Sequence, residues 1–412
     1  MGNVDQDRAI RTGRRSAESF STMRRQRLLA GCAVCGFWCG LLQILVAPIG
    51  CDSKPPQPAG PTVAWFKDFD VQGLALCSNG DGGFFLAGLG ANEGPVTVAK
   101  VTGEGGVVWA RQGLGLEGKI HVAGIAPTFD RGAAVVGTVG ERASTAADVF
   151  LLRIDAEGKE LWVKTFGGQQ FEQAASITVT RDGGFLIGGA TNSFRAGPTD
   201  LYVARTDREG QLQWETSLGI DTNHEDGGSV AQTRDDGFVV AGSSGGCTFV
   251  AKCYASGKEE WSKTYCHDGA NESGQHIVAL PEGDFVVSAA RTNKDQGVVL
   301  RRIQPWGDLL WERLLGPRDV LLHTPLLRSS NGGLVVGNRA HHDNESFAFV
   351  AGSDGNGRNL WERRLGEDRH GYCHVLDFAS TTDGGVLVLS QAVAARHCWV
   401  AKLAPPASSS AK

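Results

Sequence analysis

Two recurring markers in the sequence predict an all-β fold, a seven-bladed β-propeller with four-stranded blades. A tryptophan returns about every 50 residues, which is the period of one propeller blade. The tryptophans are Trp109, Trp162, Trp214, Trp261, Trp311 and Trp361. A turn that pairs a polar residue with glycine accompanies them and occurs seven times. The turns begin at Asp81, Asp130, Asp182, Asp236, Glu282, Asn331 and Asp383.

One unit shows how a blade is built from four short segments rich in β-branched, aromatic and small residues. These segments are 175–180, 185–189, 201–206 and 212–217. Asp182 and Gly183 permit a tight hairpin turn between the first two. Between the last two, Asp207 bonds the backbone two residues on and Gly210 adopts a left-handed conformation. We expect strands a to d in this order, with the strand d tryptophan packed between neighbouring blades.

The two ends of the repeat region predict how the ring closes. Residues 62–69 resemble strand d at 161–166 but have no blade of their own. The last unit runs from Tyr372 to Lys402 and supplies only strands a, b and c. An N-terminal strand that completes the last blade would leave no open sheet edge. Blades one to six are expected to begin near Val71, Gly118, Phe171, Asn223, Asn271 and Asp319.

The domain organisation follows from these boundaries. Residues 1–51 are predicted to be a signal for export, because a basic segment precedes an apolar run at 28–49. Residues 52–61 are a Pro-rich linker, residues 62–403 are the propeller and residues 404–412 are a disordered tail. Translation starts at Met1 or at Met23, and the sequence leaves both open.

The end of the apolar run predicts how the protein is anchored. The sequence before Cys51 resembles a bacterial lipoprotein signal, in which that cysteine would carry the lipid. The alternative is an uncleaved helix, because 22 mostly apolar residues are enough to cross a bilayer. Either way, we expect an exported protein of the bacterial cell envelope, anchored to the membrane with its propeller on the periplasmic or surface side.

The repeats resemble a known group of proteins. The Asp-Gly-Gly and Asp-x-x-Gly-x-x-x-Trp motifs are similar to those of bacterial exported β-propeller repeat proteins, and more distantly to WD40, YVTN and PQQ-like propellers. The resemblance covers about residues 62–403 and implies a fold but no single function. Quinoprotein dehydrogenases have eight blades and an adjacent-cysteine disulfide. This sequence predicts seven blades and has no Cys-Cys pair, so we expect no cofactor.

Six cysteines lie within the predicted propeller. If strands c and d of blade four fold back about residues 255–258, Cys247 lies opposite Cys266, and a disulfide there suits an oxidising compartment. Cys373 and Cys398 are a second candidate pair, since both fall near one end of blade seven. Cys77 is expected to be a buried thiol.

The charge of the chain limits the kinds of partner that the propeller can bind. The chain has a formal net charge of −5, and seven of its arginines lie in the first 27 residues, so the propeller is acidic and nucleic acid is a poor partner. We expect a monomer.

The b–c loops and d–a connections share one end of the ring, and such variable loops usually carry recognition. Candidate binding residues at this end are His323, His341, His342, Asp343, His370 and His374. They lack zinc-site spacing, so no metal site is expected.

Three functions are compatible with these features. The first is a non-catalytic envelope lipoprotein that binds a protein or a surface polymer through the loop end. The second is a hydrolase or lyase acting on a polysaccharide, with paired carboxylates at the channel mouth. Its candidate carboxylates are Glu172, Glu225 and Glu272, which recur with the repeat. The third is a structural spacer. We favour the first, because no set of residues in the repeats forms a catalytic group.

Overall fold

The computed structural model describes residues 60–405, apart from ten short gaps. The gaps are 91–93, 117, 141–146, 195–198, 221–222, 224, 317–322, 343–344, 367–372 and 393–397. The predicted export segment, Cys51 and nearly all of the linker lie outside the described residues. Within the described residues every regular element is a strand, and no helix could span a bilayer.

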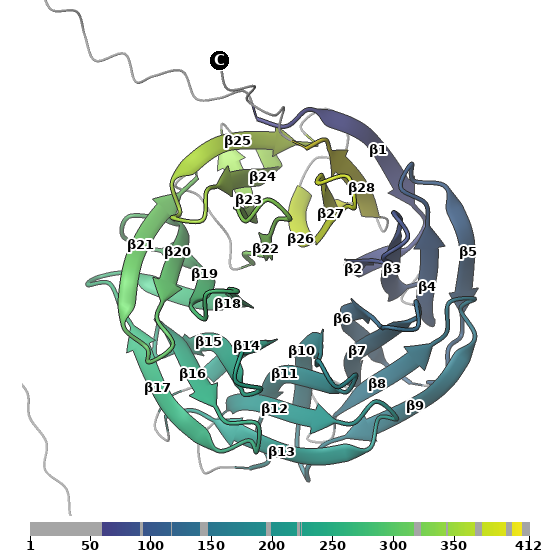
Figure 1. Ribbon diagram of the computed structural model, residues 1–412, viewed down its shortest axis with the longest axis horizontal. Helices are drawn as coiled ribbons and strands as arrows, with labels where there is room; N and C mark the ends of the chain where they lie inside the picture. Colours follow the sequence, from purple (N-terminus) through teal and green to yellow (C-terminus); the bar gives the residue numbers. More distant parts are fainter. Residues whose placement is uncertain are drawn as a thin grey trace, which may run out of the picture. The chain divides into compact units, whose positions relative to one another are not determined.

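The strands form seven antiparallel four-stranded sheets around a central channel, which confirms the predicted propeller (Figure 1). Blades one and two are β2 (Gln72–Ser78), β3 (Phe84–Leu89), β4 (Val96–Val101), β5 (Val107–Gln112), β6 (Ile120–Pro127), β7 (Ala133–Val139), β8 (Asp148–Ile154) and β9 (Glu160–Phe166). Blades three and four are β10 (Glu172–Val179), β11 (Phe185–Thr191), β12 (Asp200–Thr206), β13 (Leu212–Leu218), β14 (Glu225–Gln232), β15 (Phe238–Ser244), β16 (Cys247–Cys253) and β17 (Glu259–Tyr265).

The remaining three blades complete the ring. Blades five and six are β18 (Asn271–Ala279), β19 (Phe285–Thr292), β20 (Gly297–Ile303), β21 (Leu309–Leu315), β22 (Leu326–Arg328), β23 (Leu334–His342), β24 (Glu345–Ser353) and β25 (Asn359–Leu365). Blade seven is β26 (Cys373–Ser380), β27 (Val386–Ala392), β28 (Cys398–Leu403) and β1 (Val63–Phe69). The N-terminal strand pairs antiparallel with the last strand, with Phe66 opposite Ala401, so the predicted closure is confirmed.

Strands b and c carry the core. Both faces of each blade pack on a neighbour, so these strands are buried along almost their whole length, as in β11 and β12. One cluster joins Val136 and Leu151 of blade two to Ile187 and Tyr202 of blade three. Four of the strand d tryptophans join neighbouring blades at the outer rim, because the indole N–H donates to the c–d turn of the next blade. The bonds are Trp65 to Gly103 O at 3.1 Å, Trp109 to Ala156 O at 3.2 Å, Trp214 to Ala255 O at 3.1 Å and Trp261 to Pro305 O at 2.9 Å.

The a–b turn also contributes an ion pair within the blade. In six blades its carboxylate forms an ion pair with a lysine or arginine of strand c that lies directly opposite the strand d tryptophan. The pairs are Asp81–Lys100, Asp130–Arg153, Asp182–Arg205, Asp235–Lys252, Asp284–Arg302 and Asp383–Lys402. Blade six differs: the turn has Asn331, and Gly352 lies opposite Trp361.

Strand a is the least regular element. In six blades a β-bulge interrupts its pairing with strand b, for example between Ala174 and Ser176. In blade six it is reduced to three residues, because Pro325, just before it, has no N–H to donate to the ladder. The start expected near Asp319 falls outside the described residues.

Candidate functional site

The axial channel holds a cavity of about 580 Å³ lined by the seven innermost strands. One repeat position of strand a lies near this cavity, and in six blades it is the residue that follows the bulge. Five of its seven residues line the cavity, namely Gly124, Ser176, Ser229, His276 and Asp377. Around the ring the position is occupied by Ala75, Gly124, Ser176, Ser229, His276, Pro325 and Asp377. The side chains at this position are small in blades one to four, whereas blades five and seven have an ionisable residue. The ionisable groups therefore lie on one side of the cavity.

These side chains bond to the backbone of the next blade. Ser176 Oγ accepts the N–H of Val230 at 3.0 Å and donates to Gly228 O at 2.9 Å. Ser229 Oγ accepts the N–H of Ile277 at 3.2 Å. The inner edge of strand a has no neighbouring strand, so its N–H groups need such partners. The position after the bulge therefore ties one blade to the next.

Asp377 makes the same contact across the ring closure. Its Oδ2 accepts the N–H of Leu76 at 3.0 Å, and its Oδ1 accepts the N–H of Phe378 at 2.8 Å. Burial raises the pKa of Asp377 to about 7, although both N–H groups act in the opposite direction. This carboxyl group therefore changes charge near neutral pH.

Two histidines, His276 and His323, line the same cavity as Asp377, and His374 interacts with His323. His276 and His323 meet edge to face with ring centroids 5.5 Å apart, and His323 Nε2 is 2.7 Å from Leu376 O. Burial lowers the pKa of His276 to about 3 and of His374 to about 4, and the charge of His323 adds to both shifts. Burial also lowers the pKa of His323. The histidines are therefore neutral at pH 7.

The structure places the predicted binding residues unevenly. His323 and His374 lie together near the channel. His341 and His342 are the last residues of β23, and their side chains, like Asp343 and His370, lie outside what the structure describes. His276 and Asp377 were missed as members of this group. Aligning the repeats on the a–b turn would have shown both, because each replaces the serine of blades three and four.

The three glutamates expected at the channel mouth are not available there. Glu172 and Glu225 are fully buried, and Glu272 is 3% exposed. Each begins strand a and hydrogen-bonds to a side chain of strand b in its own blade. These three carboxylates are therefore buried rather than open to the channel.

The cysteines divide into one bridge and several buried thiols. Cys247 and Cys266 form a disulfide with Cα atoms 4.7 Å apart, in the pairing that the strand register predicts. Cys373 and Cys398 are both buried but are not joined to each other, so the second candidate bridge is absent. Cys77 is buried, and burial raises the pKa of its thiol.

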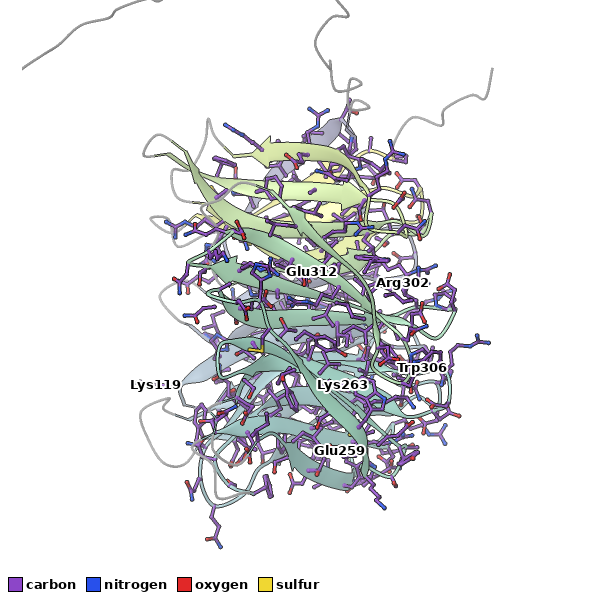
Figure 2. All side chains as sticks on the ribbon, turned by 90° about the vertical axis from the view of Figure 1, so that its left-hand side faces the viewer. Lys119, Glu259, Lys263, Arg302, Trp306 and Glu312 are labelled. Carbon is purple, nitrogen blue, oxygen red and sulfur yellow. A yellow bond between two sulfur atoms is a disulfide. The ribbon has the colours of Figure 1, made fainter. Side chains whose placement is uncertain are left out.

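Exposed apolar side chains gather at one end of the ring. Phe129, Tyr254 and Trp306 project from a–b or c–d turns, and the first residues of several d strands are also exposed, as with Val107 and Leu310. Figure 2 shows Trp306 at the edge of the ring opposite Lys119, which lies in a d–a connection. Among the described residues, most of the large exposed apolar side chains lie at this turn end.

Comparisons with known proteins show the fold alone. No family model matches the sequence, and no curated protein matches it. A lectin from Burkholderia pseudomallei, BP39L, superposes with a TM-score of 0.55 and 10% identity, over 80% of this chain and 98% of the lectin. A PL25 ulvan lyase bound to a GlcA–Rha3S oligosaccharide gives 0.52 and 9%, over 83% and 94%. BBS1N in complex with ARL6DN gives 0.51 and 10%, over 85% and 99%.

Proposed function

We propose that this chain is a cell-envelope lipoprotein whose propeller is a non-catalytic scaffold that binds a protein or a surface polymer. One observation carries the proposal. Ser176, Ser229 and Asp377 point toward the cavity but accept backbone N–H groups of other residues. A general acid or base needs an atom that can reach substrate. The polar groups of this cavity instead hold the blades together.

Propellers with a similar fold bind glycans or proteins. The superposed structures include a lectin and a complex with another protein, and this likeness supports a glycan or protein partner by analogy of fold. The predicted export segment and Cys51 support an envelope location. The binding surface we propose is the end of the ring with the b–c and d–a loops, where the channel mouth brings His323 and His374 together.

Binding is tested with full-length protein extracted in detergent. It is immobilised and exposed to envelope proteins and to purified surface polysaccharides. Phe194 is an exposed residue of the b–c loop that follows β11. Phe194→Ala should weaken capture at least tenfold, whereas the turn-end variant Trp306→Ala should leave it unchanged. If Trp306→Ala weakens capture and Phe194→Ala does not, the binding surface is at the turn end and the proposed location is wrong. Cleavage of a polysaccharide that stops in an Asp377→Asn variant would contradict the non-catalytic proposal.

Anchoring is tested by the intact mass of the membrane-extracted protein. A chain that starts at Cys51 and carries lipid is the expected result. A mass that retains residues 28–50 would instead show an uncleaved membrane anchor. This measurement is independent of partner binding, so the two parts of the proposal can fail separately.

A further inference from the structure

The described chain enters and leaves the propeller at the end of the ring that holds the a–b and c–d turns. Leu403, the last residue of β28, pairs with Val63, the first residue of β1. The N–H of Ala404 donates to Thr62 O at 2.8 Å. A Cβ atom on Gly385, in the a–b turn of blade seven, would lie 2.5 Å from Leu403 O. Both strands therefore meet the rest of the chain at the turn end.

The entry point is held against blade six. Arg363 Nη2 donates to Gly60 O at 2.8 Å, and a Cβ atom on Gly60 would lie 3.0 Å from Trp361 Cβ. Glycines of c–d turns meet the tryptophan of the preceding blade in the same way, as a Cβ atom on Gly158 would lie 2.8 Å from the Trp109 ring. Gly60 thus takes the place of the c–d turn glycine in blade seven.

Most of the large hydrophobic side chains that are exposed among the described residues lie at this same end. Three aromatic residues project from its turns: Phe129 is 76% exposed, Tyr254 50% and Trp306 58%. Val107 and Leu310, at the starts of their d strands, are exposed as well. These residues come from blades one, two, four and five, so they are spread around the ring. A flat partner can touch all of them together.

The chemistry of these side chains fits the interface between lipid and water. Trp306 has an apolar ring in solvent, while its indole N–H donates to Asp308 Oδ2 at 2.9 Å. Tryptophan and tyrosine are enriched where membranes meet water, because one part of the ring is apolar and the other polar. The a–b turn carboxylates nearby are paired with strand c cations, as Asp130 is with Arg153. These ion pairs reduce the bare negative charge at the turn end.

The length of the chain between the predicted lipid site and the propeller favours the same contact. Gly60 comes nine residues after Cys51, and nine residues span at most about 30 Å. The seven residues of β1 span about 23 Å from the turn end to the loop end. A membrane against the turn end leaves this tether slack. A membrane against the loop end would require most of its length just to pass the height of a blade.

We propose that the turn end rests on the lipid bilayer, with Phe129, Tyr254 and Trp306 in the headgroup region and the loop end facing away. This orientation rests on the membrane anchor of the proposed function. The tether keeps lipid at a high local concentration beside the turn end, so individually weak contacts suffice to orient the propeller. The turns of this end have more acidic than basic residues. Apolar contact, and not attraction to anionic lipid, therefore holds it down.

Hydroxyl-radical footprinting tests this orientation on full-length protein in vesicles of phosphatidylcholine and phosphatidylethanolamine. Phe129 and Phe194 are a matched pair, because they are the same residue type at opposite ends of the ring and are 76% and 38% exposed. With no membrane over it, Phe129 should be oxidised at least as fast as Phe194. On the vesicles we expect Phe129 to be oxidised at least fivefold more slowly. High salt should not change this ratio, because screening weakens only charge attraction.

Two variants make the comparison specific. Tyr254→Ser with Trp306→Ser removes two exposed rings from turns and leaves the core untouched. It should restore the oxidation of Phe129 to at least the rate of Phe194. Ile220→Ser removes an exposed apolar side chain at the loop end and should leave Phe129 protected. Equal protection of Phe129 in both variants would show that these aromatic rings do not make the contact, and would overturn the proposal.

Flotation of the vesicles separates failure of the anchor from failure of the orientation. A full-length chain that does not float with the vesicles would overturn the anchor and the orientation together. A chain that floats while Phe129 is oxidised as fast as Phe194 would overturn the orientation alone. Protection that disappears when the protein is diluted into more lipid would show that two copies meet at their turn ends. Protection that requires added envelope protein would show a protein partner. Either result would also overturn the proposal.

Discussion

Asp377 Oδ2 accepts the backbone N–H of Leu76 at 3.0 Å, although the two residues are 301 positions apart in the chain. The bond joins strand a of blade seven to strand a of blade one. It is the inner counterpart of the β1–β28 pairing at the rim. The ring is therefore closed by one contact near the channel and one at the outer rim. The inner contact depends on pH, because the carboxyl group of Asp377 titrates near pH 7.

Asp377→Asn should remove a pH dependence from stability. The folded pKa is about 7, whereas an unfolded aspartate titrates near about 3.9. Between these values the folded state holds a proton that the unfolded state has lost, so this residue's contribution to stability falls as pH rises. The difference in free energy of unfolding between wild type and variant, from urea denaturation, should shrink from pH 5 to pH 7.5. A constant difference would contradict this assignment.

His276→Gln should reveal the opposite dependence. Burial lowers the folded pKa of His276 to about 3, and an unfolded histidine titrates near about 6.5. The unfolded state alone takes up a proton below that pH, so the wild-type protein loses stability on acidification. The variant should lose less between pH 6.5 and pH 4.5 in the same urea assay. If both proteins lose the same amount, His276 is not buried as described.

Trp109→Phe should lower the free energy of unfolding by about 1 kcal/mol more than Trp311→Phe, because both changes shrink the indole to a phenyl ring but only the first removes a hydrogen bond, the one to Ala156 O. Trp311→Phe is the matched control. Trp311 Nε1 is buried without an acceptor among the described residues, so removing it costs no hydrogen bond. Chemical denaturation compares the two. Equal losses would show that the indole N–H bonds do not fasten the blades.

Replacing both Cys247 and Cys266 by serine should cost about 3 kcal/mol of stability, the value expected when a short closed loop is released in the unfolded state. The bridge spans 19 positions. Reduction of the wild-type protein should give a similar loss and add 2 hydrogen atoms to the intact mass, about 2 Da. A reductant that destabilises the double variant equally would show that another bond is being reduced.

Gly352→Ala should be poorly tolerated. A Cβ atom there would lie 2.1 Å from the indole of Trp361, and overpacking of this kind typically costs about 1–3 kcal/mol. Gly355→Ala is the control, because its nearest neighbour would be 3.4 Å away. Thermal unfolding of the two variants separates the outcomes. Equal midpoints would mean that Trp361 can move aside.

Much of the fold could be predicted because its signals are local. The a–b turns, the strand d tryptophans and the unpaired strand at each end are visible within a few residues, and they give blade number and closure. The ion pairs of strand c were not predicted, since Lys100 or Arg205 looks like an ordinary surface residue until its turn carboxylate is placed beside it.

The site was harder to predict than the fold. A bulge adds one residue to strand a, and this shift decides whether Asp377 or its neighbour meets the next blade. Glu225 was a candidate channel-mouth carboxylate because a glutamate recurs at this position in three blades. Its burial depends on Gly219 and Asp200 of the preceding blade, which is a tertiary relationship that no short sequence pattern contains.

The pairing of β1 with β28 also fixes the order in which the molecule can finish folding. Val63–Phe69 is synthesised before any blade, yet its partner Cys398–Leu403 comes after all the others. The leading strand therefore cannot pair with β28 until almost the whole chain has been synthesised. A stalled or shortened chain that lacks β28 keeps this exposed edge, which marks it for chaperones and proteases as unfinished.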